Sequence, residues 1–392
     1  MKILHIANDF SETKVHANLY QELDRLGVEQ TVFNPIRIKN KQSIGKNEWK
    51  ADRTNFVYAP VVKPFHRYVY HIKRRRVFRA LLQSIDVRQF NLVHATTLLT
   101  DGGQAYLLHK KFNLPYVVSV RNTDINGFLD KLPHTWRDAR NILLNAEKIF
   151  FISEGLKEKF ESHRAVRNII PKIKDKFVLL PNGIEDYFLD NIRTDQRQGH
   201  GIIYIGNFSN NKNVCRLARS VIRLQQDPSF SDVRLTIIGG GQQTDNEIDE
   251  IIANNQSTIN YLGRINDKQR LSEILCENTI FAMPSIHETF GLVYLEALSQ
   301  NLAVVYTKGQ GIDGLFDQSV GIAVNPFSEQ DIYSALKEIL TNRDRYNNKG
   351  VDFSQFRWQT IGRKYLEHYR QVLGCADVDK SLLVSFKKIL RG

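Results

Sequence analysis

Two glutamates, Glu288 and Glu296, flank a predicted anion-binding site in residues 284–305, PSIHETFGLVYLEALSQNLAVV. The apolar strand end TIFAM leads into a polar loop, a helix is predicted to begin near Phe290, and the strand LAVVY follows. Because the first N–H groups of a helix have no partner within the helix, they bind anions such as phosphate. We expect these donors to come from Thr289, Phe290, Gly291 and Leu292.

A carboxylate on each side of a phosphate site suits a ligand with hydroxyls at both ends, and a sugar nucleotide is such a ligand. Glu288 lies just before the predicted helix and Glu296 lies within it. Gly291 has no side chain, so a diphosphate can approach its backbone closely. The alternative is an ordinary amphipathic helix with two solvated acids, since an isolated pair of glutamates at this spacing is a weak signal.

The composition is that of a globular protein with more than one domain. The chain has 392 residues, of which 42% are hydrophobic and 24% charged, and its length predicts two or three domains. The net charge of +12 favours phosphates, nucleic acids or anionic lipid surfaces as partners without choosing among them. The three cysteines are far apart in the sequence, which predicts free thiols in a reducing compartment. We find no signal peptide and no stretch near the ~18 apolar residues of a membrane span, so we expect a cytoplasmic, soluble or peripheral protein.

A parallel α/β fold is predicted from the first forty residues. The strand KILHIA, a helix over VHANLYQELDRLG and the strand VEQTVFNP form a βαβ start, which predicts a doubly wound sheet with ligands at the carboxyl ends of its strands. After the polar segment RTDQRQGHG the pattern restarts with the strand GIIYIGN. The sequence therefore predicts two such domains joined by a linker over residues 193–200.

A basic, aromatic-rich stretch over residues 53–85 contains no acidic residue. This composition is typical of an interfacial helix on anionic lipid. It also fits a nucleic-acid patch or a solvated face of an ordinary helix, and the sequence leaves these alternatives open. The tail KSLLVSFKKILRG is either a second interfacial helix or a docked terminal helix. The stretch over residues 53–85 includes the basic residues Lys63, Arg67, Lys73, Arg74, Arg75, Arg76 and Arg79.

The segment HETFGLVYLEAL resembles the E-x7-E signature of retaining GT-B glycosyltransferases of the glycosyltransferase family 4 type, also called glycosyl transferases group 1. The resemblance covers residues 1 to about 374. It implies the GT-B fold, in which two Rossmann-like doubly wound α/β domains face a cleft. Its implied domains are an acceptor-side domain over 1–192, a nucleotide-sugar domain over 201–354, and a closing helix with a basic tail over 355–392. It also implies that Glu288 meets the transferred sugar and Glu296 the ribose of the donor.

The resemblance assigns further donor-binding residues. Family members usually carry an arginine directly after the glycine that ends the restarted strand and a lysine five residues beyond it, and both contact the diphosphate. Lys212 matches the lysine, but Asn207 stands in place of the arginine, and Arg264 is the candidate substitute. Gly239 and Gly240 end a strand that would face the nucleotide, and Gly263 with Arg264 would border the base.

Three residues of the first domain are candidates for the catalytic site. His94 follows a predicted strand, as a histidine does in the family's acceptor domain, although a lone histidine is also commonly structural. Arg121 and Asp124 lie in the loop where relatives often show a histidine close to the sugar. The alternative is a turn stabilised by Asx hydrogen bonds.

The function implied by the resemblance is retaining transfer of a sugar from a nucleotide-diphosphate sugar, with a UDP-sugar favoured and no metal required. The acceptor would be a glycan or a polyprenyl-diphosphate-linked glycan in the synthesis of a bacterial surface polysaccharide, such as capsule, exopolysaccharide or lipopolysaccharide. A peripheral position on the inner face of the plasma membrane and an anionic membrane surface as partner would fit such an acceptor. The alternatives are a nucleotide-sugar 2-epimerase of GT-B fold and a basic nucleic-acid-binding protein. For the second alternative, the sequence contains no recognisable nucleic-acid-binding domain.

Overall fold

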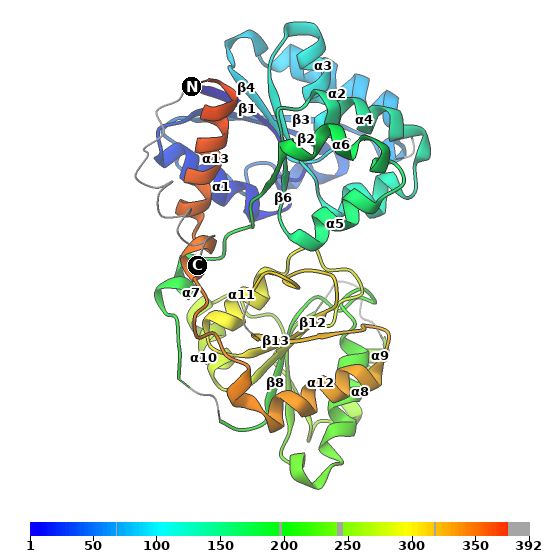
Figure 1. Ribbon diagram of the computed structural model, residues 1–392, viewed down its shortest axis with the longest axis vertical. Coiled ribbons are helices and arrows are strands. Elements are labelled where there is room, and N and C mark those ends of the chain that lie inside the picture. Colours follow the sequence, from blue (N-terminus) through cyan, green and yellow to red (C-terminus); the bar gives the residue numbers. More distant parts are fainter. Residues whose placement is uncertain (68, 196–197, 241–245, 317–318, 375–392) are drawn as a thin grey trace. The chain divides into compact units, whose positions relative to one another are not determined.

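The computed structural model describes residues 1–67, 69–195, 198–240, 246–316 and 319–374, and these form two compact units (Figure 1). The first unit contains Met1–Phe151, Glu161–Leu180 and the chain from Gln359 onward. The second unit contains Ile152–Phe160 and Pro181–Trp358. The basic tail predicted over residues 380–392 and Cys375 lie outside the described residues.

The first unit is built on a parallel sheet of seven strands in the order β3-β2-β1-β4-β5-β6-β7. Its short apolar segments are buried, and Ile3 of β1 pairs with Gln30 of β2 on one side and with Leu92 of β4 on the other. The chain runs outward from β1 in both directions, so the switch point of the sheet lies between β1 and β4. The strands are β1 (Lys2–Ile6), β2 (Glu29–Arg37), β3 (Thr54–Val62), β4 (Leu92–Ala95), β5 (Tyr116–Ser119), β6 (Lys148–Phe151) and β7 (Phe177–Leu179).

Helices cover both faces of this sheet (Figure 1). Helix α1 begins where the Thr13 hydroxyl accepts a hydrogen bond from the Val15 N–H, and it packs beside α13, whose Gly362 lies against Glu22. Helices α2, α3 and α4 pack on one another on the other face. The helices are α1 (Lys14–Arg25), α2 (Tyr70–Ser84), α3 (Gly102–Phe112), α4 (Trp136–Asn145), α5 (Glu154–Ser162, shared with the second unit), α6 (Ile170–Ile173) and α13 (Trp358–Val372).

The second unit repeats this plan with six parallel strands in the order β10-β9-β8-β11-β12-β13, and its switch point lies between β8 and β11. The strands are β8 (Gly201–Gly206), β9 (Arg234–Gly239), β10 (Ile259–Tyr261), β11 (Ile280–Ala282), β12 (Ala303–Thr307) and β13 (Gly321–Val324). The helices are α7 (Asp186–Asp190), α8 (Val214–Gln225), α9 (Asn246–Asn254), α10 (Lys268–Cys276), α11 (Leu292–Ser299) and α12 (Glu329–Thr341).

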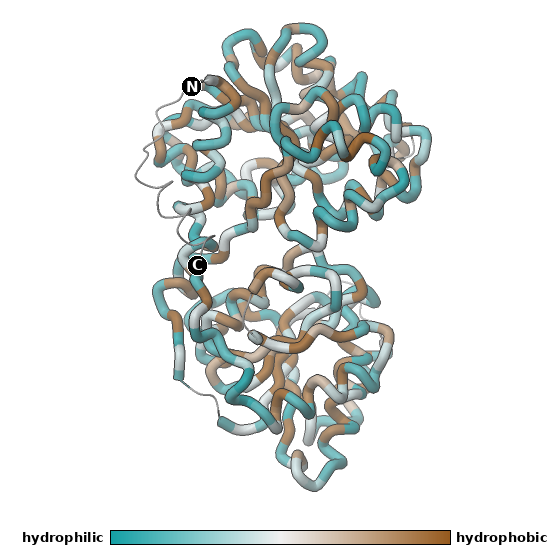
Figure 2. Tube along the Cα trace, viewed as in Figure 1, coloured by the Kyte–Doolittle hydropathy of each residue, from teal (hydrophilic) through white to brown (hydrophobic). Residues whose placement is uncertain are grey.

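Each unit has its own hydrophobic core along the central strands, where Figure 2 shows the most hydrophobic segments. The predicted architecture of two doubly wound parallel sheets is confirmed. None of the described helices is both long and apolar enough to cross a bilayer.

Candidate functional sites at the two switch points

A lysine–glutamate pair occupies the switch point of the second unit. Lys212 lies in the loop after β8 and Glu288 in the loop after β11, and Lys212 Nζ is 2.7 Å from Glu288 Oε2. The same carboxylate accepts hydrogen bonds from the Ser285 hydroxyl (3.3 Å) and the Thr289 N–H (3.0 Å). With these three donors, the Glu288 side chain is only 9% exposed. The structure therefore brings together the two residues on which the prediction of a diphosphate site most depends.

Two asparagines that the sequence analysis missed hold the two loops together. Asn211 exchanges side-chain hydrogen bonds with the backbone of His287, donating to its carbonyl and accepting from its N–H, both at 3.0 Å. Asn213, in the left-handed conformation, donates from its side chain to the Pro284 carbonyl (2.9 Å). These bonds fix Lys212 between two anchored neighbours, which pre-organises its ammonium group. The only signal in the sequence is the cluster of asparagines around Lys212.

Helix α11 begins at Leu292, two residues later than predicted, with Gly291 as its N-cap at φ +75°. A Cβ atom at Gly291 would collide with the Tyr294 ring, so this position requires glycine for both space and backbone conformation. The Thr289 N–H donates to Glu288, so it is not the free donor that we predicted. Within the described ranges, the N–H groups of Phe290, Gly291 and Leu292 donate no hydrogen bond, and they remain available to an anion.

The glycines predicted to face the nucleotide gather at the carboxyl ends of β9 and β10. The Gly239 N–H donates to the Gly263 carbonyl (2.7 Å), and the Gly240 N–H donates to the Gly206 carbonyl (3.2 Å). Gly239 has φ +131°, and a Cβ there would overlap the Gly206 oxygen. Arg264 donates through Nη2 to the Gly240 carbonyl (2.9 Å). These contacts form a backbone surface at the sheet edge, on the β9 side of the lysine–glutamate pair.

Asn207 and Arg264 are placed differently from Lys212. The Asn207 carbonyl accepts a hydrogen bond from the Tyr204 hydroxyl (2.9 Å), while its side chain is exposed. Arg264 is exposed and engaged with Gly240, and no described contact joins it to Lys212 or Glu288. Its role as a substitute for the arginine that family members carry stays a prediction.

Glu296 on α11 is half-buried, and its carboxylate accepts no hydrogen bond from the described residues. Burial and the neighbouring Glu185 raise the pKa of Glu296 from 4.5 to about 7, and Lys268, which is ion-paired with Glu185, offsets part of this shift. The Glu296 carboxylate therefore lacks hydrogen-bond donors among the described residues, and the hydroxyl groups of a ligand would supply such donors.

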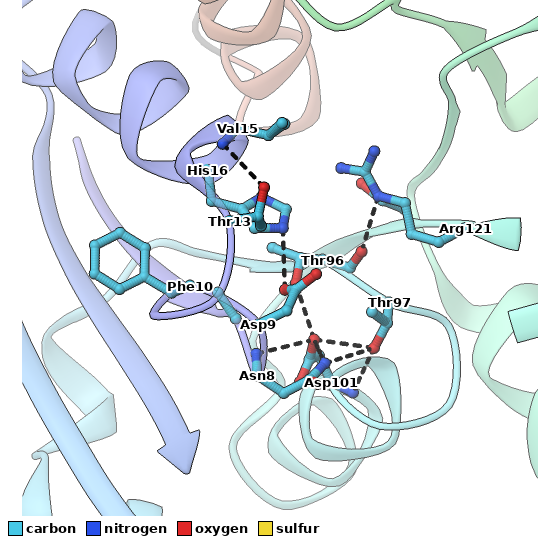
Figure 3. Close-up of polar contacts among 12 residues, drawn as sticks. Asn8, Asp9, Phe10, Thr13, Val15, His16, Thr96, Thr97, Asp101 and Arg121 are labelled. Atoms are coloured by element: carbon cyan, nitrogen blue, oxygen red, sulfur yellow. Dashed lines mark hydrogen bonds and ion pairs between the residues drawn. The ribbon is translucent and has the colours of Figure 1, made fainter. Parts of the chain in front are cut away.

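The switch point of the first unit holds a buried aspartate, Asp101, which the sequence analysis missed (Figure 3). Its Oδ2 accepts hydrogen bonds from the side chains of Asn8 (2.8 Å), Thr96 (2.9 Å) and Thr97 (2.9 Å). Its Oδ1 is buried and accepts no hydrogen bond from the described residues. Burial and the nearby Asp9 raise the pKa of Asp101 to about 7. Asp101 thereby ties the loop after β1 to the loop after β4.

Asp9 and His16 point toward one another beside this aspartate (Figure 3). Asp9 Oδ1 is 3.0 Å from His16 Nε2, and the Asp9 side chain is 36% exposed whereas that of His16 is 4% exposed. Burial acts to raise the pKa of Asp9, but His16 and Arg121 outweigh it and bring the pKa to about 2. Asp9 is therefore an ionised carboxylate at the carboxyl end of β1. Its position directly after the first strand was the signal available in the sequence.

Arg121 lies at the same edge of the sheet, and Asp124 lies beneath it. Arg121 Nε donates weakly to the Thr96 carbonyl (3.4 Å), and Figure 3 shows no contact from its two terminal nitrogens to the residues drawn. Asp124 is fully buried, and its carboxylate accepts from the N–H groups of Arg121 (2.9 Å) and Leu99 (3.4 Å). Burial raises the pKa of Asp124 to about 6. The structure thus supports the turn-stabilising alternative for Asp124 and leaves Arg121 as the accessible member of the pair.

His94, predicted as a polar group at the cleft, lies instead in the core. It is fully buried, with Nε2 3.2 Å from the Ser119 hydroxyl and Nδ1 2.7 Å from the Tyr369 hydroxyl. Burial lowers its pKa well below the usual value. Because Tyr369 belongs to α13, His94 fastens the last described helix to the first sheet, which is the structural alternative considered for it.

Comparison with known proteins identifies the class that this fold and these sites define. The family model described as Glycosyl transferases group 1 matches residues 199–342, and the one described as Glycosyltransferase Family 4 matches residues 14–187. A curated relative is the putative teichuronic acid biosynthesis glycosyltransferase TuaC of Bacillus subtilis (strain 168), which is 23% identical over 385 residues, covering 90% of each chain.

Solved structures share the fold at low sequence identity. Sucrose-phosphate synthase from Thermosynechococcus elongatus superposes with a TM-score of 0.70 at 16% identity, covering 96% of this chain and 100% of that chain. HepE of Anabaena, solved in complex with UDP and glucose, gives a TM-score of 0.63 at 14% identity, covering 95% and 100%. The chain belongs to the GT-B glycosyltransferases of the glycosyltransferase family 4 type, and its activity is glycosyl transfer.

Proposed function

We propose that the protein is a retaining glycosyltransferase that uses a nucleotide-diphosphate sugar, with UDP as the favoured nucleotide. We propose a glycan or a polyprenyl-diphosphate-linked glycan of a bacterial surface polysaccharide as its acceptor. The observation that carries this proposal is the Lys212–Glu288 pair beside the open N-terminus of α11. The name of the B. subtilis relative supports the polysaccharide, and the UDP bound to HepE supports the nucleotide.

In the proposed reaction the acceptor oxygen bonds to the anomeric carbon on the face from which the diphosphate departs. The bond from that carbon to the diphosphate breaks, and the acceptor's proton passes to the departing phosphate oxygen. Lys212 and the N–H groups of residues 290–292 stabilise the charge that develops on the leaving group. Glu288 orients the sugar and Glu296 the ribose. The proposal requires no metal.

The glycosyl acceptor would bind at the sheet edge of the first unit. There the Asp9 carboxylate can accept hydrogen bonds and the Arg121 guanidinium can donate them. A carboxylate next to a guanidinium suits neighbouring hydroxyls of a sugar, since one group accepts and the other donates. We therefore propose Asp9 and Arg121, instead of His94 and Asp124, as the residues that contact the glycosyl acceptor, with the buried His16 holding the Asp9 carboxylate in place. The buried Asp101 positions this group through its contacts to Asn8 and Thr96.

The donor assignment predicts selective stabilisation by one nucleotide. We expect UDP to raise the melting temperature saturably, because a ligand at 100 times its Kd adds about 2.7 kcal/mol to the unfolding free energy. GDP, ADP, CMP and NAD serve as comparisons in the same thermal-shift measurement. An equal response to NAD, or none to any nucleoside diphosphate, would contradict the donor site. Retention is tested separately by NMR, since slow hydrolysis of an α-linked donor should release the α-anomer first.

The acceptor assignment predicts a loss of acceptor binding in Asp9→Asn. Removing one charged hydrogen-bond partner should raise the acceptor KM roughly 10- to 100-fold, while the melting shift with UDP stays unchanged. The measurement is transfer of radiolabelled sugar from the UDP donor to a panel of octyl glycosides. Asp175→Asn, an exposed aspartate of the same unit, is the matched control and should behave like the wild type. Equal KM values for all three proteins would remove Asp9 from the acceptor site.

A further inference from the structure

The segment that follows Arg121 is a π-helix, η4 (Asp124–Leu129), at the carboxyl end of β5. The Asp130 N–H donates to the Ile125 carbonyl (2.9 Å), five residues earlier. The buried Asp124 holds the start of this helix, because its carboxylate accepts from the Arg121 N–H (2.9 Å). Short π-helical turns are rare and occur frequently at functional sites. The turn therefore gives a defined shape to the sheet edge at which we place the glycosyl acceptor.

Two asparagines on this segment form a hydrogen-bonded amide pair. Asn126 Nδ2 donates to Asn122 Oδ1 (2.9 Å), and both side chains are partly exposed. Asn122 Nδ2 donates no hydrogen bond to any of the described residues. A primary amide has one donor end and one acceptor end, so the bond from Asn126 fixes which end of Asn122 is left for a ligand. In this orientation Asn122 presents its N–H groups, directly after Arg121 in the chain.

We propose that Asn122 is a specificity-determining residue of the acceptor site and that Asn126 is the positioning residue that makes it a hydrogen-bond donor. The ligand group is a hydroxyl oxygen of the acceptor sugar that accepts a hydrogen bond from Asn122 Nδ2. This inference rests on the proposed function, which places the acceptor sugar at Asp9 and Arg121. It adds a neutral donor to those two charged groups, so the site distinguishes hydroxyls that must donate from those that must accept.

The alternative is that the amide pair only stabilises the π-helical turn. In that case replacing either asparagine would lower the melting temperature without changing which acceptors are used. A recognition role instead changes the preference among acceptors at one ring position. These two roles therefore predict different results in one experiment.

Acceptor analogues that differ in hydrogen-bonding capacity test the proposal. We would take the octyl glycoside that the wild type glycosylates best and replace each hydroxyl in turn by fluorine, which can only accept, or by an ammonium group, which can only donate. At one ring position the wild type should use the fluoro analogue roughly tenfold better than the ammonium analogue, measured as kcat/KM. Asn122→Ala should lose this preference and keep the preferences at the other positions.

Asn126→Asp should reverse the preference without removing Asn122. A carboxylate cannot donate to Asn122 Oδ1, so the Asn122 amide is expected to turn, donate to the new carboxylate and present its oxygen to the ligand. The ammonium analogue should then be used better than the fluoro analogue at the same ring position. Thr123→Asp is the control for added charge, because Thr123 is exposed and no described contact joins its side chain to Asn122. This control should keep the wild-type order.

An unchanged order in Asn126→Asp, or an equal reversal in Thr123→Asp, would overturn the proposal. Lower melting temperatures in Asn122→Ala and Asn126→Asp with every preference intact would assign the pair to the turn alone, which also overturns it. The melting shift with UDP should be the same in all variants, since the donor site lies in the other unit. A raised acceptor KM in Asp9→Asn together with unchanged preferences in the asparagine variants would refute this inference and leave the proposed acceptor site standing.

Discussion

Replacing Lys212 by alanine is expected to slow sugar transfer by a factor of roughly 100 to 1000. The diphosphate leaves with additional negative charge, and removing one pre-organised group that stabilises such charge costs about 2.7–4 kcal/mol in the barrier. The fold should survive, since Glu288 keeps its hydrogen bonds from Ser285 and Thr289. The measurement is the single-turnover rate of transfer, with the melting temperature recorded alongside it.

The ion pair allows a sharper test than a single substitution. If Lys212 and Glu288 act as one unit, Lys212→Ala/Glu288→Gln should be little slower than either single variant. Lys349→Ala, an exposed lysine of the same unit, is the control and should keep wild-type turnover. Wild-type turnover in Lys212→Ala would refute the assignment. Full additivity of the two single effects would mean that the residues act separately.

Replacing Glu296 by glutamine is expected to weaken UDP binding and stabilise the free protein. Loss of a charged acceptor for the ribose hydroxyls should weaken binding roughly 10- to 100-fold. Because the pKa of Glu296 is raised from 4.5 to about 7, its ionisation destabilises the folded state progressively as the pH rises through this range. Glutamine removes this cost, so at pH 8 the unfolding free energy should rise by about 3 kcal/mol.

The pH dependence gives this prediction a second measurement. Hydroxyl groups that donate to Glu296 favour its ionised form, so wild-type affinity for UDP should fall as the pH is lowered from about 8 to about 6. In Glu296→Gln the affinity, measured by calorimetry, should change little over the same range. Glu277→Gln, an exposed acid of the same unit, is the control. A pH profile that is identical in wild type and Glu296→Gln would exclude Glu296 from the nucleotide site.

The sequence by itself determined the features that depend on short stretches of chain. The apolar runs that become β1 and β8 and the helices after them define parallel α/β units, because hydrophobic periodicity is local. The segment HETFGLVYLEAL and Lys212 could be recognised because residue types at fixed spacing carry the chemistry of an anion site. Even there, the helix begins two residues later than predicted, since Gly291 takes the N-cap position.

Only the tertiary structure decided which polar residues are accessible and which of them meet. Asp9 and Arg121 come together because β1 and β5 both border β4, a pairing of strands that no local pattern encodes. The sequence pattern also places His94 and Asp124 near this edge of the sheet. In the structure both side chains are buried, and their hydrogen bonds hold the fold together. Neighbouring arginines likewise take opposite roles, since the helical rotation turns Arg74 toward Asp138 and leaves Arg75 in solvent. Accessibility and pKa depend on everything that packs around a side chain, and that environment comes from residues far apart in the sequence.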